Sequence, residues 1–464
     1  MAAAMEEIQD KTPNVLRAGD LTTGKITGTL FRFTLPMIAG SLLQQCYNIA
    51  DTIIVGRAIG AEALAAVGSS YTLMVFLTSI LTGLSMGSGT IFSLRYGAGD
   101  RTGLKESISA SFVLIGGIII LLTLTAFATL NPVLRWLQVP ADVTAPMRDY
   151  LWIIYWGIGF IFLYNYFAAL LRAIGDSVTP LIWLAGAAIL NIGLDLLFIL
   201  EFGWGIRGAA AATVISQGVS GIGLGIQTIM TRRQLLPSGN EYRPDRKTLK
   251  NIAAFSSLTC IQQSVMNLGI LAVQGLVNSF GTVVMAAFAA AVKIDSFAYM
   301  PVQEFGNAFS TFIAQNHGAG RQDRIRKGIT RAVLIMALFS ITVSATVFLC
   351  AGPLMRIFVD GNETGIIDAG IGYLRIEGAC YIGIGLLFML YGYYRAICMP
   401  GMSVILTVLS LGTRVALSYM LAPVPGIGET GIWWSIPIGW ALADLVGVIR
   451  YFHLKRRQAA GSAA

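Results

Sequence analysis

The chain has 464 residues, of which 55% are hydrophobic and only 12% are charged, and its mean hydropathy is +0.70. These values exclude a soluble multidomain protein and indicate an all-α polytopic membrane protein. The formal net charge of +8 does not indicate nucleic acid as a partner, because the basic residues stand in short clusters between apolar runs. The five cysteines have no spacing that would build a disulfide or metal framework.

Apolar runs of about 20 residues predict twelve membrane-spanning helices in two sets of six. The first set is 30–56, 68–95, 108–130, 149–171, 179–200 and 207–230. The second set is 252–279, 283–315, 330–352, 369–394, 401–422 and 432–452. We therefore expect an N-terminal segment (1–29), an N-lobe (30–230), a linker (231–250), a C-lobe (251–453) and a C-terminal tail (454–464).

The two sets share landmarks at a nearly constant separation, which indicates a duplicated six-helix unit. The motif at 95–100 (RYGAGD) recurs at 316–321 (NHGAGR). Arg172 recurs as Arg395, and Gly205 and Gly208 recur as Gly428 and Gly431. Because six is even, both copies enter the membrane from the same side, which gives a parallel pseudo-two-fold repeat. Two such lobes are typical of secondary transporters, although a two-lobed channel is an alternative.

The distribution of lysine and arginine predicts the orientation in the membrane. With the N-terminus inside, 24 of these residues fall in inside segments and six in outside segments. Since cytoplasmic loops are enriched in Lys and Arg, both termini and the linker are predicted to be cytoplasmic. The polar stretch before the first span contains no apolar signal-peptide core, so the first span is expected to act as its own signal.

A polar stripe runs along the first span and must face protein or water. It comprises Ser41, Gln44, Gln45, Asn48, Asp51 and Thr52. Hydrogen bonding between helices explains the glutamines and Asn48 best, whereas a carboxylate at the depth of Asp51 indicates function. Pro36 removes one backbone hydrogen bond earlier in the same helix and predicts a kink or hinge.

The fifth span carries Asn191 and Asp195 four residues apart, so both side chains share one helix face. A carboxylate in the bilayer centre costs at least ~2.5–3.5 kcal/mol, which indicates a functional role, although an interhelical hydrogen-bonding pair is the alternative. Thr213 and Gln217 on the sixth span project toward a neighbouring helix. Asp51, Asn191, Asp195 and Thr213 together could supply oxygen ligands for Na⁺ or hold a proton.

The second half carries fewer acidic residues at these depths. Its predicted intramembrane charges are Lys293, Asp295, Glu304 and Arg414. Glu304 is a second-tier candidate for a cation or substrate site, with a structural ion pair to Arg414 as the alternative. The aromatic residues of the fourth and tenth spans include Tyr155, Tyr164 and Tyr391, which could hold organic cations if they faced a cavity. Most of these rings are expected to serve packing.

Several motifs and residue types that would indicate an enzyme are missing or incomplete. The stretch 19–25 has the spacing of a phosphate-binding loop, but Ile26 replaces the hydroxyl residue that binds magnesium. The two histidines, His317 and His453, form no metal cluster or catalytic triad. We therefore expect no enzymatic activity and no cofactor, with an ion gradient as the energy source.

These residues resemble the multidrug and toxic compound extrusion (MATE) family, in the branch of the DNA-damage-inducible exporters. The resemblance covers residues 30–455. The motifs that carry it are 48–52 (NIADT), Gly56-Arg57, 97–99 (GAG), 172–176 (RAIGD), Asn191 with Asp195, and 315–320 (QNHGAG). It implies a cation site at Asp51, Asn191, Asp195 and Thr213 and helix bending at Pro36. The chain departs from the other branch, whose site uses a seventh-helix glutamate, because 252–279 contains no acidic residue.

The resemblance also implies a function. We expect a monomeric antiporter in the plasma membrane of a prokaryote, which exchanges H⁺ or Na⁺ for cationic or amphipathic organic compounds by alternating access. A lipid-linked oligosaccharide flippase of the same superfamily is the main alternative. Such flippases often have fourteen spans and a cationic cavity, whereas this chain has twelve predicted spans and mostly acidic intramembrane charge. A channel or a non-transporting receptor scaffold is a further alternative.

Overall fold

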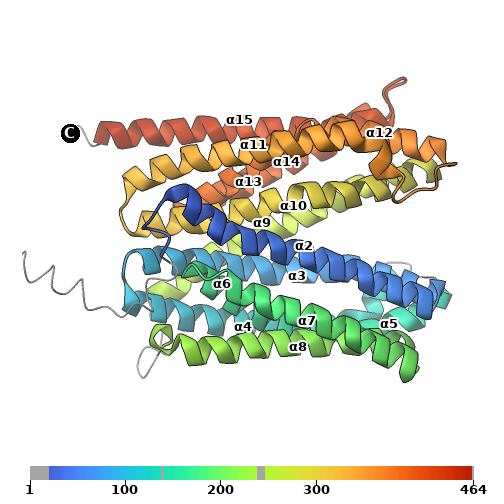
Figure 1. Cartoon of the computed structure of the whole chain (residues 1–464), viewed down its shortest axis with the longest axis horizontal. Helices are drawn as coiled ribbons and strands as arrows, with labels where there is room; N and C mark the ends of the chain where they lie inside the picture. Colours follow the sequence, from blue (N-terminus) through green and yellow to red (C-terminus); the bar gives the residue numbers. More distant parts are fainter. Residues whose placement is uncertain (1–19, 137–139, 238–245, 462–464) are drawn as a thin grey trace, which may run out of the picture.

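The computed structural model describes residues 20–136, 140–237 and 246–461, and every regular element in these ranges is a helix (Figure 1). Most of the predicted N-terminal segment, the middle of the predicted linker and the last residues of the predicted tail lie outside the described residues. Helices are the expected solution in lipid, because they satisfy their own backbone hydrogen bonds where water is absent.

The first six spans are built from the following helices: α2 (Ile26–Ala58), α3 (Ala61–Gly97), α4 (Arg101–Trp136), α5 (Ala141–Trp156), α6 (Ile158–Ala173), α7 (Val178–Leu196) with its π-helical extension η2 (Leu197–Glu201), and α8 (Gly205–Thr231). A short 3₁₀ turn, η3 (Arg233–Leu235), follows. The second six are built from α9 (Arg246–Asn278), α10 (Thr282–Gly318), α11 (Gln322–Met355), α12 (Thr364–Gly378), α13 (Tyr381–Ala396), α14 (Pro400–Leu421) and α15 (Glu429–Gly461).

The span count confirms the prediction of twelve. Ten helices of the described ranges are long and apolar enough to cross a membrane alone, and two bent pairs raise the number to 12. The pairs are α5 with α6, bent by 44°, and α12 with α13, bent by 50°. The breaks lie inside the predicted spans 149–171 and 369–394, which the hydropathy pattern does not divide. Many helices also run past the predicted ends, because hydropathy marks only the part of a helix that lies in lipid.

Glycine at the first break lets a neighbouring helix approach. A Cβ atom added to Gly157, between α5 and α6, would lie 2.7 Å from the Gln217 Oε1 atom of α8 and 3.0 Å from the carbonyl oxygen of Ile154. Any larger residue would have to displace the Gln217 side chain and would press on the Ile154 carbonyl. The break thus lies at a glycine that α8 approaches closely, and the proline of α5, Pro146, lies more than two turns earlier.

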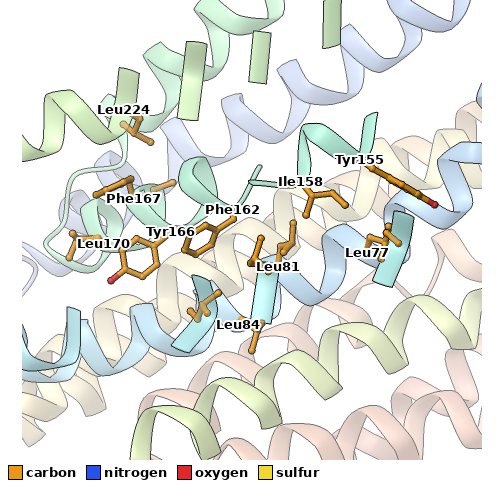
Figure 2. Close-up of a cluster of buried hydrophobic side chains, with 14 of the residues drawn as sticks. Leu77, Leu81, Leu84, Tyr155, Ile158, Phe162, Tyr166, Phe167, Leu170 and Leu224 are labelled. Carbon is orange, nitrogen blue, oxygen red and sulfur yellow. The ribbon is translucent and has the colours of Figure 1, made fainter. Parts of the chain in front are cut away.

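The spans form two lobes, each with its own hydrophobic core. In Figure 1, α3 to α8 occupy the lower part of the view and α10 to α15 the upper part, and α2 runs from the upper part to the lower. Figure 2 shows part of the N-lobe core, in which Leu81 and Leu84 of α3 lie near Phe162 of α6 and Leu77 lies near Tyr155 of α5. The C-lobe core joins residues of α9 to α15, including Phe288, Tyr373 and Trp433, whose rings pack together.

Helix α2 is shared between the two lobes. Its first half packs against α10, where Leu30, Phe33 and Met37 lie in one cluster with residues of α10 such as Phe309. Its second half packs inside the N-lobe, where Val55 lies against residues of α3, α5 and α8. The helix runs through Pro36 without a break. Pro36 therefore lies near the point where α2 passes from one lobe to the other.

Contacts between the lobes lie toward one end of the bundle, which we call the terminal end because α2 begins and α15 ends there (Figure 1). Helices α3 and α9 touch closely in this part, where the Ser88 and Ser256 hydroxyl oxygens lie 2.9 Å apart. A Cβ atom on Gly83 would lie 2.5 Å from the Cα atom of Cys260. We call the other end of the bundle the far end.

Candidate functional site

Three helices of the N-lobe bring together the four residues predicted to bind a cation. Asp51 lies on α2, Asn191 and Asp195 lie on α7, and Thr213 lies on α8. Helix α7 is apolar except on the face that carries Asn191 and Asp195, and that face is buried against α2 and α8. The Asn191 side-chain nitrogen donates a hydrogen bond to the Thr213 hydroxyl at 3.4 Å, and that hydroxyl donates to the Ala209 carbonyl at 3.0 Å.

The site holds carboxylate and amide oxygens that lack partners. Asp195 is 0% exposed and Asn191 is 2% exposed. One carboxylate oxygen of Asp51, both of Asp195 and the Asn191 side-chain oxygen are buried and accept no hydrogen bond. Among the ion pairs of the described residues, none includes either aspartate.

Unpartnered buried oxygens are costly unless something positive binds them. The Asp51 and Asp195 carboxyl groups face each other within electrostatic reach, and the amide oxygen of Asn191 lies one helical turn before Asp195. Such a set suits a hard cation, which prefers oxygen ligands, or a proton shared by two carboxylates. The arrangement can therefore take up and release one positive charge.

Two tyrosines of the site are missing from the sequence prediction. Tyr47, one turn before Asp51 on α2, and Tyr150 of α5 both lie within electrostatic reach of Asp51 and Asp195. The four-residue spacing from Asp51 would have indicated Tyr47. Nothing in the sequence distinguishes Tyr150 from the other aromatic residues of its span, because its role depends on how α5 packs against α2.

The second-tier residues of the N-lobe lie around the site or inside the lobe core. Gln217 packs against Gly157 at the break between α5 and α6. Gln44 is exposed, and Asn48 donates a hydrogen bond to Gln45 at 3.4 Å. Hence Asn48 and Gln45 pair with each other along α2, and Gln44 does not lie inside the lobe core.

Tyr155 and Tyr391 pack within the lobes, whereas Tyr164 is half-buried and lies within electrostatic reach of Glu304 of the C-lobe. Tyr155 is 2% exposed, and its ring lies 5.6 Å from that of Phe127. The Tyr164 hydroxyl donates to the Pro180 carbonyl at 3.1 Å, which ties α6 to the start of α7. Tyr391 is buried in the C-lobe core beside Phe388. Tyr155 and Tyr391 thus contribute to packing, and Tyr164 alone of the three lies beside charged groups of the contact between the lobes.

The C-lobe contains a second buried set of charges. Asp295 of α10 and Glu377 of α12 are 6% and 3% exposed, and both lie within electrostatic reach of Arg414 of α14. Lys293 precedes Asp295 by two residues. Glu377 falls inside the predicted span 369–394, so its depth in an apolar run was the signal that could have found it.

Glu304 lies apart from Arg414, with other partners. Its carboxyl group lies within electrostatic reach of Arg172 and Arg395, the pair of arginines that the duplication relates. Arg395 is 4% exposed and donates hydrogen bonds to the Ser310 hydroxyl at 3.3 Å and the Asn307 side-chain oxygen at 3.2 Å. The ion pair considered from the sequence, Glu304 with Arg414, is therefore not among the ion pairs of the described residues.

Comparison with known proteins supports the two-lobe architecture. The ranges 36–197 and 259–420 each match the MatE family model. The second match is displaced from the first by the same separation that relates Arg395 to Arg172 and Gly428 to Gly205. This agreement confirms the duplication.

The chain is similar to the probable multidrug resistance protein YpnP of Bacillus subtilis (strain 168), with 29% identity over 94% of this chain and 97% of the relative. It is 26% identical to the probable multidrug resistance protein NorM of Thermotoga maritima over 88% of each chain. The fold matches a solved multidrug resistance MATE family transporter of the MOP superfamily in an outward-facing conformation. That match has a TM-score of 0.88 and 24% identity, and it covers 96% of this chain and 99% of that chain.

Proposed function

The chain belongs to the MatE family, and on this premise we propose that it is a cation-coupled antiporter that exports cationic or amphipathic organic compounds by alternating access. The observation that carries the proposal is the buried, unpartnered oxygen set of Asp51, Asn191 and Asp195. The names of the relatives YpnP and NorM, both described as probable multidrug resistance proteins, support the substrate class.

The proposed coupling acts through the contact between α2 and α7. A proton or sodium ion held by Asp51, Asn191, Asp195 and Thr213 removes the repulsion between the two carboxylates and draws α2 toward α7. Loss of the cation restores the repulsion and loosens this contact. Because α2 packs on the C-lobe with its first half and on the N-lobe with its second, a shift of α2 changes how the lobes meet.

Exchange requires that cation and substrate prefer opposite conformations. In the proposed cycle, binding of the cation from the far end favours the conformation that releases the organic substrate there. Release of the cation at the terminal end then favours the conformation that takes up new substrate. The 24 to 6 excess of Lys and Arg supports a cytoplasmic terminal end, and we propose the plasma membrane of a prokaryote as the location.

The test is efflux of a fluorescent cationic dye from proteoliposomes under an imposed H⁺ or Na⁺ gradient. Asp51→Asn and Asp195→Asn should each abolish gradient-driven efflux while the protein stays folded. Asp444→Asn is the matched control, because Asp444 of α15 is also buried, at 7% exposure, but lies in the other lobe. Efflux at the unmodified rate from both site variants would rule out the proposed coupling site.

A further inference from the structure

Two glycines make reciprocal contacts where the lobes meet at the terminal end. A Cβ atom on Gly97, the last residue of α3, would overlap the Gln315 carbonyl of α10. A Cβ atom on Gly318, the last residue of α10, would overlap the Leu94 carbonyl of α3. The two contacts are related by the internal duplication, because Leu94 and Gln315 stand at equivalent positions one helical turn before the glycines. The backbones of α3 and α10 touch here, which leaves no room for water.

The two copies carry different residues at one position of this contact. Leu94 in the first copy is replaced by Gln315 in the second, and the Gln315 side chain is 0% exposed. Its Nε2 atom donates a hydrogen bond to the Ala173 carbonyl at the end of α6, at 2.7 Å. Its Oε1 atom accepts a hydrogen bond from the Leu21 backbone N–H at 3.0 Å. One side chain of the C-lobe thus binds the N-lobe and the segment before α2 at once.

The segment before α2 is held on the C-lobe by further hydrogen bonds. Asn316 donates to the Leu21 carbonyl at 3.2 Å, and Arg324 of α11 donates to the Leu21 carbonyl at 3.3 Å and the Gly24 carbonyl at 2.7 Å. The Leu21 side chain is buried in the cluster that joins α2 to α10. The stretch 21–24 therefore belongs to the C-lobe surface, and the Gln315 contact to Ala173 links this assembly to the end of α6.

We propose that Gln315 is the positioning residue that holds the terminal end of the transporter closed. Its carboxamide hydrogen-bonds both to the end of α6 in the N-lobe and to the stretch 21–24 on the C-lobe surface. The glycines Gly97 and Gly318 let α3 and α10 approach closely enough for these hydrogen bonds to form. Opening toward the terminal end requires that the Gln315 to Ala173 hydrogen bond break, while the contact to Leu21 can move with the C-lobe. The proposal rests on the alternating access proposed above.

The test measures which end of the bundle is open. In a background with all five cysteines replaced by alanine, Ser256→Cys reports on the terminal end, since Ser256 is 0% exposed in the contact between α9 and α3. Tyr71→Cys reports on the far end, since Tyr71 of α3 is 55% exposed and lies within electrostatic reach of Tyr299 of the C-lobe. Each reporter is labelled in proteoliposomes of known orientation with a membrane-impermeant maleimide.

Gln315→Leu copies the residue of the equivalent position and removes both hydrogen bonds. It should raise labelling of the Ser256→Cys reporter from the terminal end about fivefold, the effect of the one hydrogen bond, to Ala173, that opening breaks, and lower labelling of the Tyr71→Cys reporter from the far end. Gln315→Glu, once ionised, keeps the acceptor for Leu21 but has no donor for Ala173, so at high pH it should shift both reporters in the same directions. Gln322→Leu, at an exposed position of α11, should change neither reporter.

Opposite changes of the two reporters separate gating from damage, because a protein that is merely loosened exposes both. Unchanged labelling in folded Gln315→Leu and Gln315→Glu, or a rise in both reporters, would overturn the proposal. The assay needs neither an ion gradient nor an organic substrate. If the Asp51 and Asp195 variants failed to abolish efflux, the labelling result would still stand. If Gln315→Leu failed to change labelling, the proposed cation site would likewise be unaffected.

Discussion

The carboxyl groups of Asp51 and Asp195 face each other across the contact between α2 and α7, although they lie far apart in the sequence. Asp195 is 0% exposed, and neither of its carboxylate oxygens accepts a hydrogen bond. An arrangement of two like groups without a basic partner is unfavourable for stability on its own. This arrangement is the reason for which we propose a bound proton or sodium ion at the site.

The first prediction concerns the stability of the N-lobe. Asp195→Asn keeps the size of the side chain but removes the like-charge repulsion with Asp51 and the burial of a carboxylate. The melting temperature at neutral pH should equal or exceed that of the unmodified protein, while gradient-driven efflux falls at least tenfold. Thermal unfolding in detergent, followed beside the dye assay, checks both. A melting temperature several degrees lower would show that Asp195 is a structural residue.

Thr213 provides a second prediction, because its hydroxyl can be removed without changing the shape of the side chain. Thr213→Val loses the acceptor for Asn191 and one oxygen of the proposed cation site, whereas Thr213→Ser keeps the hydroxyl. The ion concentration for half-maximal efflux should rise about tenfold in Thr213→Val, the effect of one to two hydrogen bonds, and change little in Thr213→Ser. The efflux rate is measured at increasing Na⁺ concentration at fixed pH, and at different pH values without Na⁺. The two series distinguish coupling to Na⁺ from coupling to H⁺. Equal values for both variants would exclude the hydroxyl from the site.

The span count and the duplication could be predicted because lipid imposes a strong and local constraint: long apolar runs mark the helices, and short motifs mark the copies. The same constraint identifies the candidate site residues Asp51, Asn191 and Asp195, because polar side chains are rare in membrane-spanning runs. Tyr150 could not, because its position depends on the packing of α5. The break at Gly157 could not either, since the chain has 52 glycines and only the approach of α8 distinguishes this one.

Replacing glycine by alanine should have opposite effects on stability at Gly116, in an open part of α4, and at Gly97, in the contact between the lobes. Glycine to alanine inside an open helix position normally stabilises by about 0.5–1 kcal/mol. Gly116→Ala should follow this rule, because a Cβ atom on Gly116 of α4 would meet no other atom within 4 Å. Gly97→Ala should instead push α3 away from the Gln315 carbonyl and destabilise the closed terminal end.

The measurement for these glycines is thermal stability together with labelling of the Ser256→Cys reporter. We expect Gly97→Ala and Gly318→Ala to behave alike, since the duplication relates their contacts. Both should raise labelling from the terminal end, whereas Gly116→Ala should not. Wild-type labelling in Gly97→Ala would show that the contact between α3 and α10 adjusts to an added methyl group.

The last prediction concerns Pro36, which lies near the point where α2 passes from the C-lobe to the N-lobe. Proline leaves one backbone carbonyl of the helix without its usual donor and so makes bending there easier. Pro36→Ala restores that hydrogen bond and should stiffen α2, which lowers the rate of gradient-driven efflux several-fold without lowering the melting temperature. Pro132→Ala is the matched control, because Pro132 lies near the end of α4, a helix that contributes buried residues to the N-lobe core along its whole length. If α2 bends at another position during transport, both proline variants will export the dye at the same rate as the unmodified protein.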